Sequence, residues 1–159
     1  MGNIALYWTS LVIPLMVFIP NLLWVLLPAT NKPSSKEIND PMYLTILENM
    51  GRVGVTIIPL FYLIILDNAL KYFYLITMIV FLAVYYFCWV RFFLGGRNYT
   101  LLFMPLWRIP IPMAISPIIY FILSAILLKS IPMLIAALLL AIGHIPISYR
   151  DYQRIKREG

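Results

Sequence analysis

Long apolar runs dominate this sequence and leave few folds open to it. The runs cover residues 4–27, 43–66, 72–93, 111–128 and 131–149. A helix that crosses the hydrocarbon of a bilayer needs about 20 apolar residues. Five crossings therefore use about 100 residues of the 159 in the chain, which leaves too few for a separate globular domain. We predict one polytopic membrane domain that occupies residues 1–159.

The composition excludes the other broad classes. Hydrophobic residues make up 63% of the chain and charged residues 11%, whereas soluble domains are about 45–50% apolar and about 25% charged. Disordered chains need low hydrophobicity, which this sequence lacks. The net charge of +6 would suggest nucleic acid in a soluble protein. In a membrane protein it indicates basic cytoplasmic loops and contact with anionic headgroups of membrane lipids, so no nucleic acid partner is expected.

The predicted fold class is all-α, a bundle of about five kinked transmembrane helices. Kinks are expected because Pro14, Pro20, Pro59, Pro117 and Pro146 fall inside the apolar runs, and proline removes a backbone hydrogen bond from a helix. Neighbouring helices and hydroxyl side chains can satisfy the carbonyls that proline frees.

Two stretches between or after the apolar runs complete the predicted domain. Residues 94–110 contain several prolines and Arg108, which favours an interfacial connector. Residues 150–159 form a basic cytoplasmic tail. The pairs Gly51/Gly54 and Ala137/Ala141 supply small residues at helical spacing, which is typical of close helix contact in membranes.

The distribution of basic residues predicts the orientation. With five crossings, one side of the membrane receives only Lys71 and Lys129. The other side receives Lys32, Lys36, Arg52, Arg91, Arg97, Arg108, Arg150, Arg154, Lys156 and Arg157. Because Lys and Arg are retained in cytoplasmic loops, we expect the N-terminus outside, the C-terminus in the cytoplasm, and a multi-pass protein of the cell membrane.

Polar side chains gather in the cytoplasmic half of the predicted bundle. A helix rises 1.5 Å per residue, which places these groups within about 9 Å of the inner boundary. The candidate ligand-binding residues are Asn21, Glu48, Arg52, Arg91, Arg108, His144 and Tyr149. Ionisable groups inside a membrane usually face the bundle interior or a wet cavity. The pattern therefore predicts a polar cavity that opens toward the cytoplasm.

Two interpretations of Glu48 and Arg52 remain open. The spacing i,i+4 makes them a self-neutralising ion pair on one helix face. Alternatively, Arg52 acts with Arg91 or Arg108 to hold a carboxylate or phosphate, for which the planar guanidinium is well suited. Glu48 would then orient Arg52, and His144 and Asn21 would supply hydrogen bonds.

The sequence offers little support for catalysis or metal binding. His144 and Cys88 are the only residues of their types, whereas zinc sites need about four ligands. Ser116 and His144 could form a nucleophile and base, but no GxSxG elbow surrounds the serine. No catalytic residue, metal or cofactor is predicted. His144 could relay protons or form an ordinary hydrogen bond.

Aromatic residues add one candidate feature. Tyr85, Tyr86 and Trp89 form a group inside the third apolar run. Such residues usually anchor helices at the membrane interface, but aromatic surfaces also line apolar ligand sites. Both roles remain open for this group.

Three functions follow from these features. The first is binding or transport of an anionic or amphipathic small molecule or lipid in the polar cavity. The second is a non-catalytic accessory or immunity-type subunit, working through a membrane-protein partner or a homo-oligomer. The third is a small intramembrane enzyme that acts on a lipid-like substrate.

Overall fold

The computed structural model describes residues 6–31, 40–106 and 109–158. Its α-helices are α1 (Val12–Leu26), α2 (Met42–Ile57), α3 (Ala69–Leu94), α4 (Pro112–Leu127) and α5 (Ile131–Glu158). Three short 3-10 helices accompany them, η1 (Trp8–Leu11), η2 (Ile58–Phe61) and η3 (Tyr99–Leu102). Within the described residues the chain has no β-strand, only an isolated bridge between Leu106 and Ile109.

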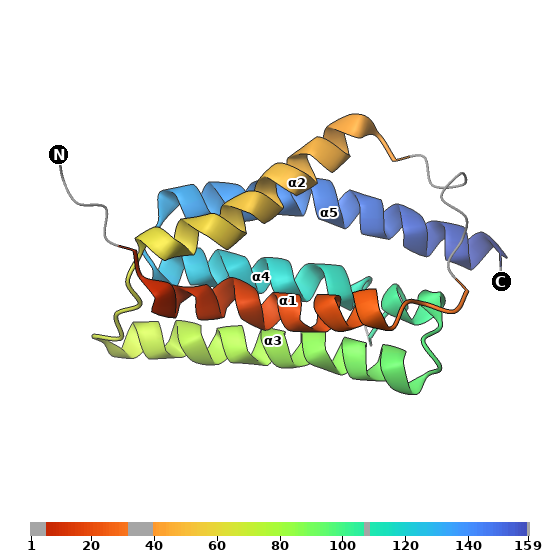
Figure 1. The fold of residues 1–159 in the computed structure, drawn as a ribbon, viewed down its shortest axis with the longest axis horizontal. Coiled ribbons are helices and arrows are strands. Elements are labelled where there is room, and N and C mark those ends of the chain that lie inside the picture. Colours follow the sequence, from red (N-terminus) through yellow and green to blue (C-terminus); the bar gives the residue numbers. More distant parts are fainter. Residues whose placement is uncertain (1–5, 32–39, 107–108, 159) are drawn as a thin grey trace.

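Successive helices run in opposite directions along the bundle (Figure 1). At one end α1 begins beside η1, α2 passes into η2, and short segments lead to α3 and α5; we call this the closed end. At the other end lie the last turns of α1, α3 and α5 and the first turns of α2 and α4, and we call it the open end. Helix α1 therefore begins at the closed end and α5 finishes at the open end.

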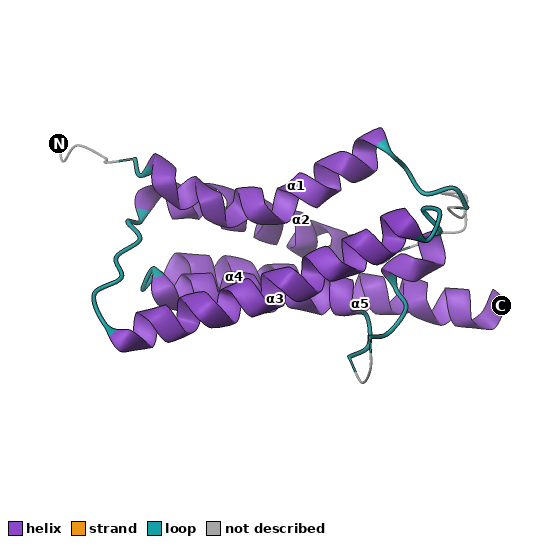
Figure 2. Cartoon of the chain, turned by 90° about the horizontal axis from the view of Figure 1, so that it is seen from below, coloured by secondary structure: helices purple, strands orange, loops and turns teal. Residues whose placement is uncertain are grey.

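The helices pack as two groups. Helix α2 lies against α5, and α4 lies between α3 and α5, while α1 lies on α3 and α4. The view in Figure 2 shows α1 along one face of the bundle. Figure 1 shows α2 diverging from α1 toward the open end. Helix α5 therefore packs closely against α2 and α4, whereas α1 makes a looser contact with α3 and α4.

Small residues explain the tight pairing of α2 with α5. A Cβ added to Gly54 would lie 2.5 Å from Cβ of Ala136, and one added to Gly143 would lie 2.5 Å from the backbone N of Glu48. At Gly51 it would collide with the backbone of Leu140. The predicted role of Gly51 and Gly54 as contact residues thus agrees with the structure, whereas Gly143 was not anticipated.

The helices are long and apolar enough to form a membrane bundle. Four of them, the segments 8–26, 42–61, 69–94 and 131–157, meet the length and hydropathy of a membrane span. The fifth, α4, is apolar but only 16 residues long. These lengths and hydropathies are consistent with a helical membrane bundle, and the predicted fourth crossing, residues 111–128, falls on this shorter helix.

Two predicted boundaries were wrong. The second run was expected to be helical through residue 66, but α2 ends at Ile57, η2 ends at Phe61, and residues 62–67 are extended or bent. Pro59 accounts for the change because it cannot donate the hydrogen bond that an α-helix requires. The kink predicted at Pro59 is therefore a helix end. Residues 150–158, predicted as a tail, continue α5 without a break.

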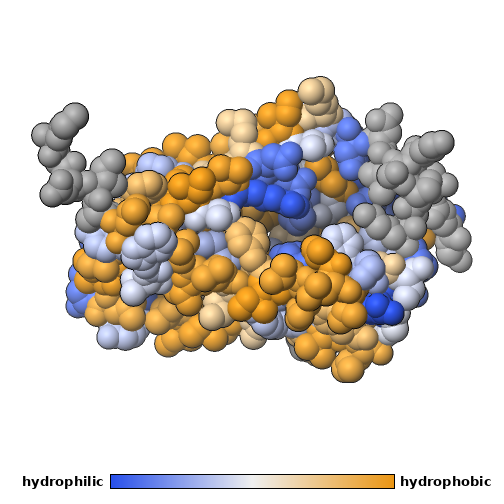
Figure 3. Space-filling view, viewed as in Figure 1, coloured by the Kyte–Doolittle hydropathy of each residue, from blue (hydrophilic) through white to orange (hydrophobic). Residues whose placement is uncertain are grey.

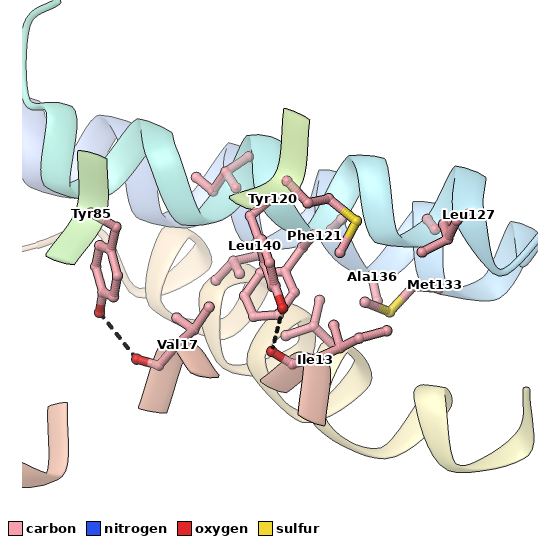
Figure 4. Packing of buried hydrophobic residues seen from close by; sticks show 14 of the residues in the cluster. Ile13, Val17, Tyr85, Tyr120, Phe121, Leu127, Met133, Ala136 and Leu140 are labelled. Carbon is pink, nitrogen blue, oxygen red and sulfur yellow. Dashed lines mark hydrogen bonds between the residues drawn. The ribbon is translucent and has the colours of Figure 1, made fainter. Parts of the chain in front are cut away.

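A tyrosine hydroxyl compensates for a proline in α1. Pro20 lies inside this helix and cannot donate a hydrogen bond to the carbonyl of Met16. The hydroxyl of Tyr86 donates to that carbonyl over 2.8 Å. Tyr120 donates to the carbonyl of Ile13 over 3.2 Å (Figure 4), although no proline removes the helical donor there. These hydroxyls attach α1 to α3 and α4, as expected where no water is present to satisfy the backbone.

Candidate functional site

A cavity of about 550 Å³ lies inside the open-end half of the bundle. All five α-helices and η3 contribute to its wall. Figure 3 shows hydrophilic residues gathered over α2 beside a hollow between α2 and α1. The polar lining residues are Asn21, Glu48, Arg52, Tyr85, Tyr99, His144, Ser148 and Asp151. The volume is within the ~300–1,000 Å³ typical of small-molecule sites.

Glu48 is the centre of the polar group. Its Oε1 accepts a hydrogen bond from the Arg52 guanidinium and lies 2.9 Å from Nδ1 of His144. An ionised carboxylate only accepts hydrogen bonds, so Nδ1 of His144 donates to it. Nε2 is then the ring nitrogen that this pair does not use. The predicted Glu48–Arg52 pair is present, and the structure adds His144 from a helix far away in the sequence.

The three side chains differ in their access to the cavity. The Glu48 side chain is 11% exposed, that of His144 27%, and that of Arg52 55%. Glu48 is therefore the buried anchor, and Arg52 is the cation that a ligand can reach. Glu48 accepts a hydrogen bond from one nitrogen of the Arg52 guanidinium. Because the Arg52 side chain is half exposed, its other N–H groups can donate to a second acceptor.

The close helix crossing explains why Glu48 meets His144. Gly143 lies directly before His144 and faces the backbone of Leu44 and Glu48. A side chain at position 143 would separate the two helices and withdraw the imidazole from the carboxylate. The sequence signal for this contact is a glycine next to the only histidine.

A second polar group ties α1 to the cavity wall. Nδ2 of Asn21 donates to the carbonyl of Val17 and to the hydroxyl of Tyr85, each over 2.9 Å. The Tyr85 hydroxyl donates to the same Val17 carbonyl over 3.2 Å (Figure 4). Asn21 therefore lines the cavity as predicted, and its amide nitrogen is already used to hold α1 against α3.

The outer rim of the cavity carries an acid, a base and a phenol. Asp151 and Tyr99 line the cavity, and Nη1 of Arg154 lies 3.4 Å from Oδ1 of Asp151. Burial, together with the nearby Asp151 carboxylate, raises the pKa of the Tyr99 hydroxyl above its usual range, so Tyr99 is a neutral donor. Asp151 was missed from the sequence because residues 150–159 were predicted to be a tail. A helix continued through that stretch places His144, Ser148 and Asp151 on one face.

Two of the predicted site residues that the structure describes, Arg91 and Tyr149, do not line the cavity. Arg91 donates to the carbonyls of Leu101 and Met104 over 2.8 Å and so fixes the connector. Tyr149 is exposed and lies against the Tyr152 ring. Arg108 lies outside the described residues.

The aromatic group divides between two roles. Tyr85 and Trp89 line the cavity, as one of the two predicted roles requires. The hydroxyl of Tyr86 instead donates to the backbone carbonyl of Met16 in α1. The cavity wall therefore has a polar part and an aromatic part on α3.

The cavity provides few groups for metal or covalent chemistry. Among the described residues, no three His, Cys, Asp or Glu side chains gather as they would around a metal ion. Ser116 is buried in α4 and is not one of the residues that line the cavity. Cys88 is fully buried and also lies away from the lining residues. The chemistry of this cavity is thus that of Arg, Glu, His and amide groups, which recognise anions and hydrogen-bonding ligands.

Comparisons with known proteins assign no function to this site. No family model matches this chain, and neither a curated protein nor a solved structure matches it.

Proposed function

We propose that this chain is a multi-pass protein of the cell membrane that binds or transports an anionic or amphipathic small molecule or lipid. The observation that carries the proposal is Arg52, a half-exposed cation held by Glu48 in the wall of a cavity of about 550 Å³. A charge within a membrane span is costly unless it has a function or a partner. Glu48 alone supplies a partner for only part of the guanidinium.

The basic residues support an opening toward the cytoplasm. Lys71 and Lys129 lie at the closed end, whereas the last turns of α5 at the open end carry Arg150, Arg154 and Arg157. Since basic residues are retained on the cytoplasmic side, the open end faces the cytoplasm and α1 begins on the outside. The basic turns of α5 then contact anionic lipid headgroups. Pro20, Pro117 and Pro146 inside α1, α4 and α5 favour kinks that widen this end.

Native mass spectrometry of protein extracted gently from its own membrane tests the proposal. We expect a bound anionic molecule or lipid that is lost in Arg52→Gln. The matched control is Lys129→Gln, because Lys129 is an exposed cation at the closed end, outside the cavity. Retention of the ligand in Arg52→Gln contradicts the proposal. A second protein subunit in place of a small molecule supports the accessory-subunit function instead.

A further inference from the structure

Along the bundle, the polar lining residues are confined to the part of the cavity toward the open end, where apolar residues also line it, and the part toward the middle of the bundle is apolar. On α1 the polar Asn21 is followed, one turn toward the closed end, by Val17; on α5 His144 is followed in the same direction by Leu140. On α2, Val55 lies closer to the closed end than either charged residue. The apolar inner wall comprises Val17, Val55, Ile118, Phe121 and Leu140, all buried. A ligand that fits this division has a polar head toward the open end and an apolar chain toward the middle of the bundle.

The cavity also opens sideways between α1 and α2. These helices are joined at the closed end, where the Tyr7 amide donates to the Leu60 carbonyl over 2.7 Å and the Ser10 hydroxyl donates to the Tyr62 carbonyl over 2.5 Å. Beyond that end α1 packs on α3 and α4, and α2 packs on α5. The hollow in Figure 3 lies between the two helices. The side opening is therefore narrowest at the closed end and widens toward the open end.

Exposed apolar side chains lie on both helices. Leu22 and Val25 on α1 are 64% and 73% exposed, and Met50 and Val53 on α2 are 56% and 58% exposed; Val25 also lines the cavity. In a membrane bundle, side chains with this exposure face lipid. The opening thus connects the cavity to the hydrocarbon of the leaflet at the open end.

One helix edge at the opening is polar. Thr45, Asn49 and Arg52 follow the spacing i, i+4 and i+7 along α2, which places them on one side of the helix. All three are exposed. Polar groups that face lipid are costly, so this polar edge favours a ligand that brings its own polar head to it. The edge runs about 10 Å along the helix, which is about a third of the ~30 Å thickness of the hydrocarbon.

We propose that the ligand is a single-chain anionic amphiphile that enters sideways between α1 and α2. This inference rests on the proposed function and names its ligand class. The carboxylate or phosphate head lies on Arg52 and the polar edge, and the chain lies against the apolar inner wall. An amphiphile in the cytoplasmic leaflet already has its head toward the open end and its chain toward the bilayer centre. It therefore enters without turning over.

The size of the cavity selects one chain rather than two. The inner wall covers one to two helical turns, about 5–10 Å, whereas the chains of a bilayer lipid extend through about 15 Å of one leaflet. A cavity of about 550 Å³ is in the range that encloses a drug-sized molecule. A two-chain phospholipid would leave most of its second chain outside.

Binding of defined probes to the full-length protein in zwitterionic nanodiscs tests the ligand class. The probes are decanoate and decyl phosphate as amphiphiles, acetate and inorganic phosphate as heads without a chain, and dioleoyl phosphatidic acid as a two-chain lipid. We expect both amphiphiles to bind and their affinity to fall about tenfold or more in Arg52→Gln, since a hydrogen bond to a charged group contributes about 1.5–3 kcal/mol. Lys129→Gln, at the closed end and outside the cavity, is the control and should keep the wild-type affinity.

The outcomes separate this inference from the proposed function. If acetate and inorganic phosphate bind as well as the amphiphiles, the proposed function stands and the amphiphile inference is wrong. Equal or tighter binding of dioleoyl phosphatidic acid overturns the single-chain part. If none of the probes binds to folded protein, and native mass spectrometry also finds no small ligand, both proposals are wrong.

A reversible cross-link tests the sideways route. The variant carries Val25→Cys on α1 and Asn49→Cys on α2, two exposed positions of which Val25 lines the cavity and Asn49 belongs to the polar edge, and a cleavable cross-linker joins them. Cys88 is fully buried and does not compete. We expect association of decyl phosphate to slow about tenfold or more and to recover when the linker is cleaved. An unchanged association rate overturns the sideways route.

Discussion

The closed and open ends of this bundle are built from the same helices, yet they use polar groups differently. At the closed end, polar groups satisfy each other: the buried Ser10 hydroxyl donates to a carbonyl of the neighbouring segment, and Lys71 pairs with Asp67 over 3.0 Å. At the open end, Glu48, Arg52 and His144 form a group that still faces a cavity. The difference is that polar groups close one end of the bundle, whereas in the other half they remain in the wall of a cavity.

The apolar packing shows the same difference. Near the closed end, Met133 and Ala137 are fully buried and Leu127 is nearly so, and Figure 4 shows Leu127, Met133 and Ala136 packed close together. Farther from the closed end, a hollow lies between α1 and α2 (Figure 3). We expect substitutions at the helix crossing to affect both ends, and substitutions of individual polar groups to affect only one.

The largest effect is expected for Gly143→Leu. The new side chain collides with the backbone of α2 at Leu44 and Glu48, so α2 and α5 must separate. Overpacking of this kind costs about 3 kcal/mol. Thermal unfolding in detergent should show a large loss of stability, whereas Ile142→Leu, at an exposed neighbouring position, should be close to wild type. Wild-type stability of Gly143→Leu would contradict the close crossing that joins the two ends.

A smaller loss, about 2 kcal/mol, is expected for Glu48→Leu. It leaves His144 and Arg52 without their shared acceptor, which costs less than in a dry core because Arg52 is half exposed. Asp67→Asn at the closed end leaves an amide oxygen that can still accept from the buried Lys71 ammonium and should cost less. The free energy of unfolding of both variants, from denaturant titration, gives the comparison. An equal cost would show that the two ends do not differ as described.

Loss of the Tyr86 hydroxyl should cost about 1 kcal/mol. Tyr86→Phe leaves the Met16 carbonyl without the donor that replaces the N–H missing at Pro20. Pro20→Ala restores a backbone N–H to that carbonyl, so Tyr86→Phe should cost less in the Pro20→Ala background. A double-mutant cycle measures the coupling. Strict additivity of the two changes would mean that the hydroxyl does not compensate for the proline.

The smallest expected effect is a pH dependence of the local stability at the closed end. The hydrogen bond from Lys71 lowers the pKa of Asp67 below its usual 3.8. A depressed folded-state pKa stabilises the protein above the unfolded value and loses this stabilisation as the pH falls through the folded value. Hydrogen exchange at the first turn of α3 should therefore accelerate below about pH 4 in the wild type. Asp67→Asn should show no such step; if it does, another group is responsible.

Local patterns were enough to predict several features of the fold. The lengths of the apolar runs predicted a helical membrane bundle, and the i,i+4 spacing placed Glu48 beside Arg52. The small pair Gly51/Gly54 predicted a close helix contact. The predicted run extended to residue 66, beyond the end of α2 at Ile57. Residues 58–66 remain apolar, so hydropathy alone does not indicate that the helix ends near Pro59. Apolar character is additive along a run, whereas one missing N–H ends a helix at a single position.

The candidate site was predicted only in part, for a similar reason. Depth along each helix can be counted from the sequence, and it correctly grouped Asn21, Glu48, Arg52 and His144. Depth does not give the direction in which a side chain points. Arg91 has the right depth, but its guanidinium turns to the carbonyls of the connector.

The sequence by itself determined that this protein is a helical membrane bundle with charge concentrated toward one end, because these properties depend on the length and order of its apolar runs. Only the tertiary structure decided which of those charges meet. The backbone of Gly143 allows α5 to approach α2 closely enough for His144 to bond Glu48, and α1 stays apart from α2 so that a cavity remains. Both depend on how helices distant in sequence pack together, which no local spacing specifies.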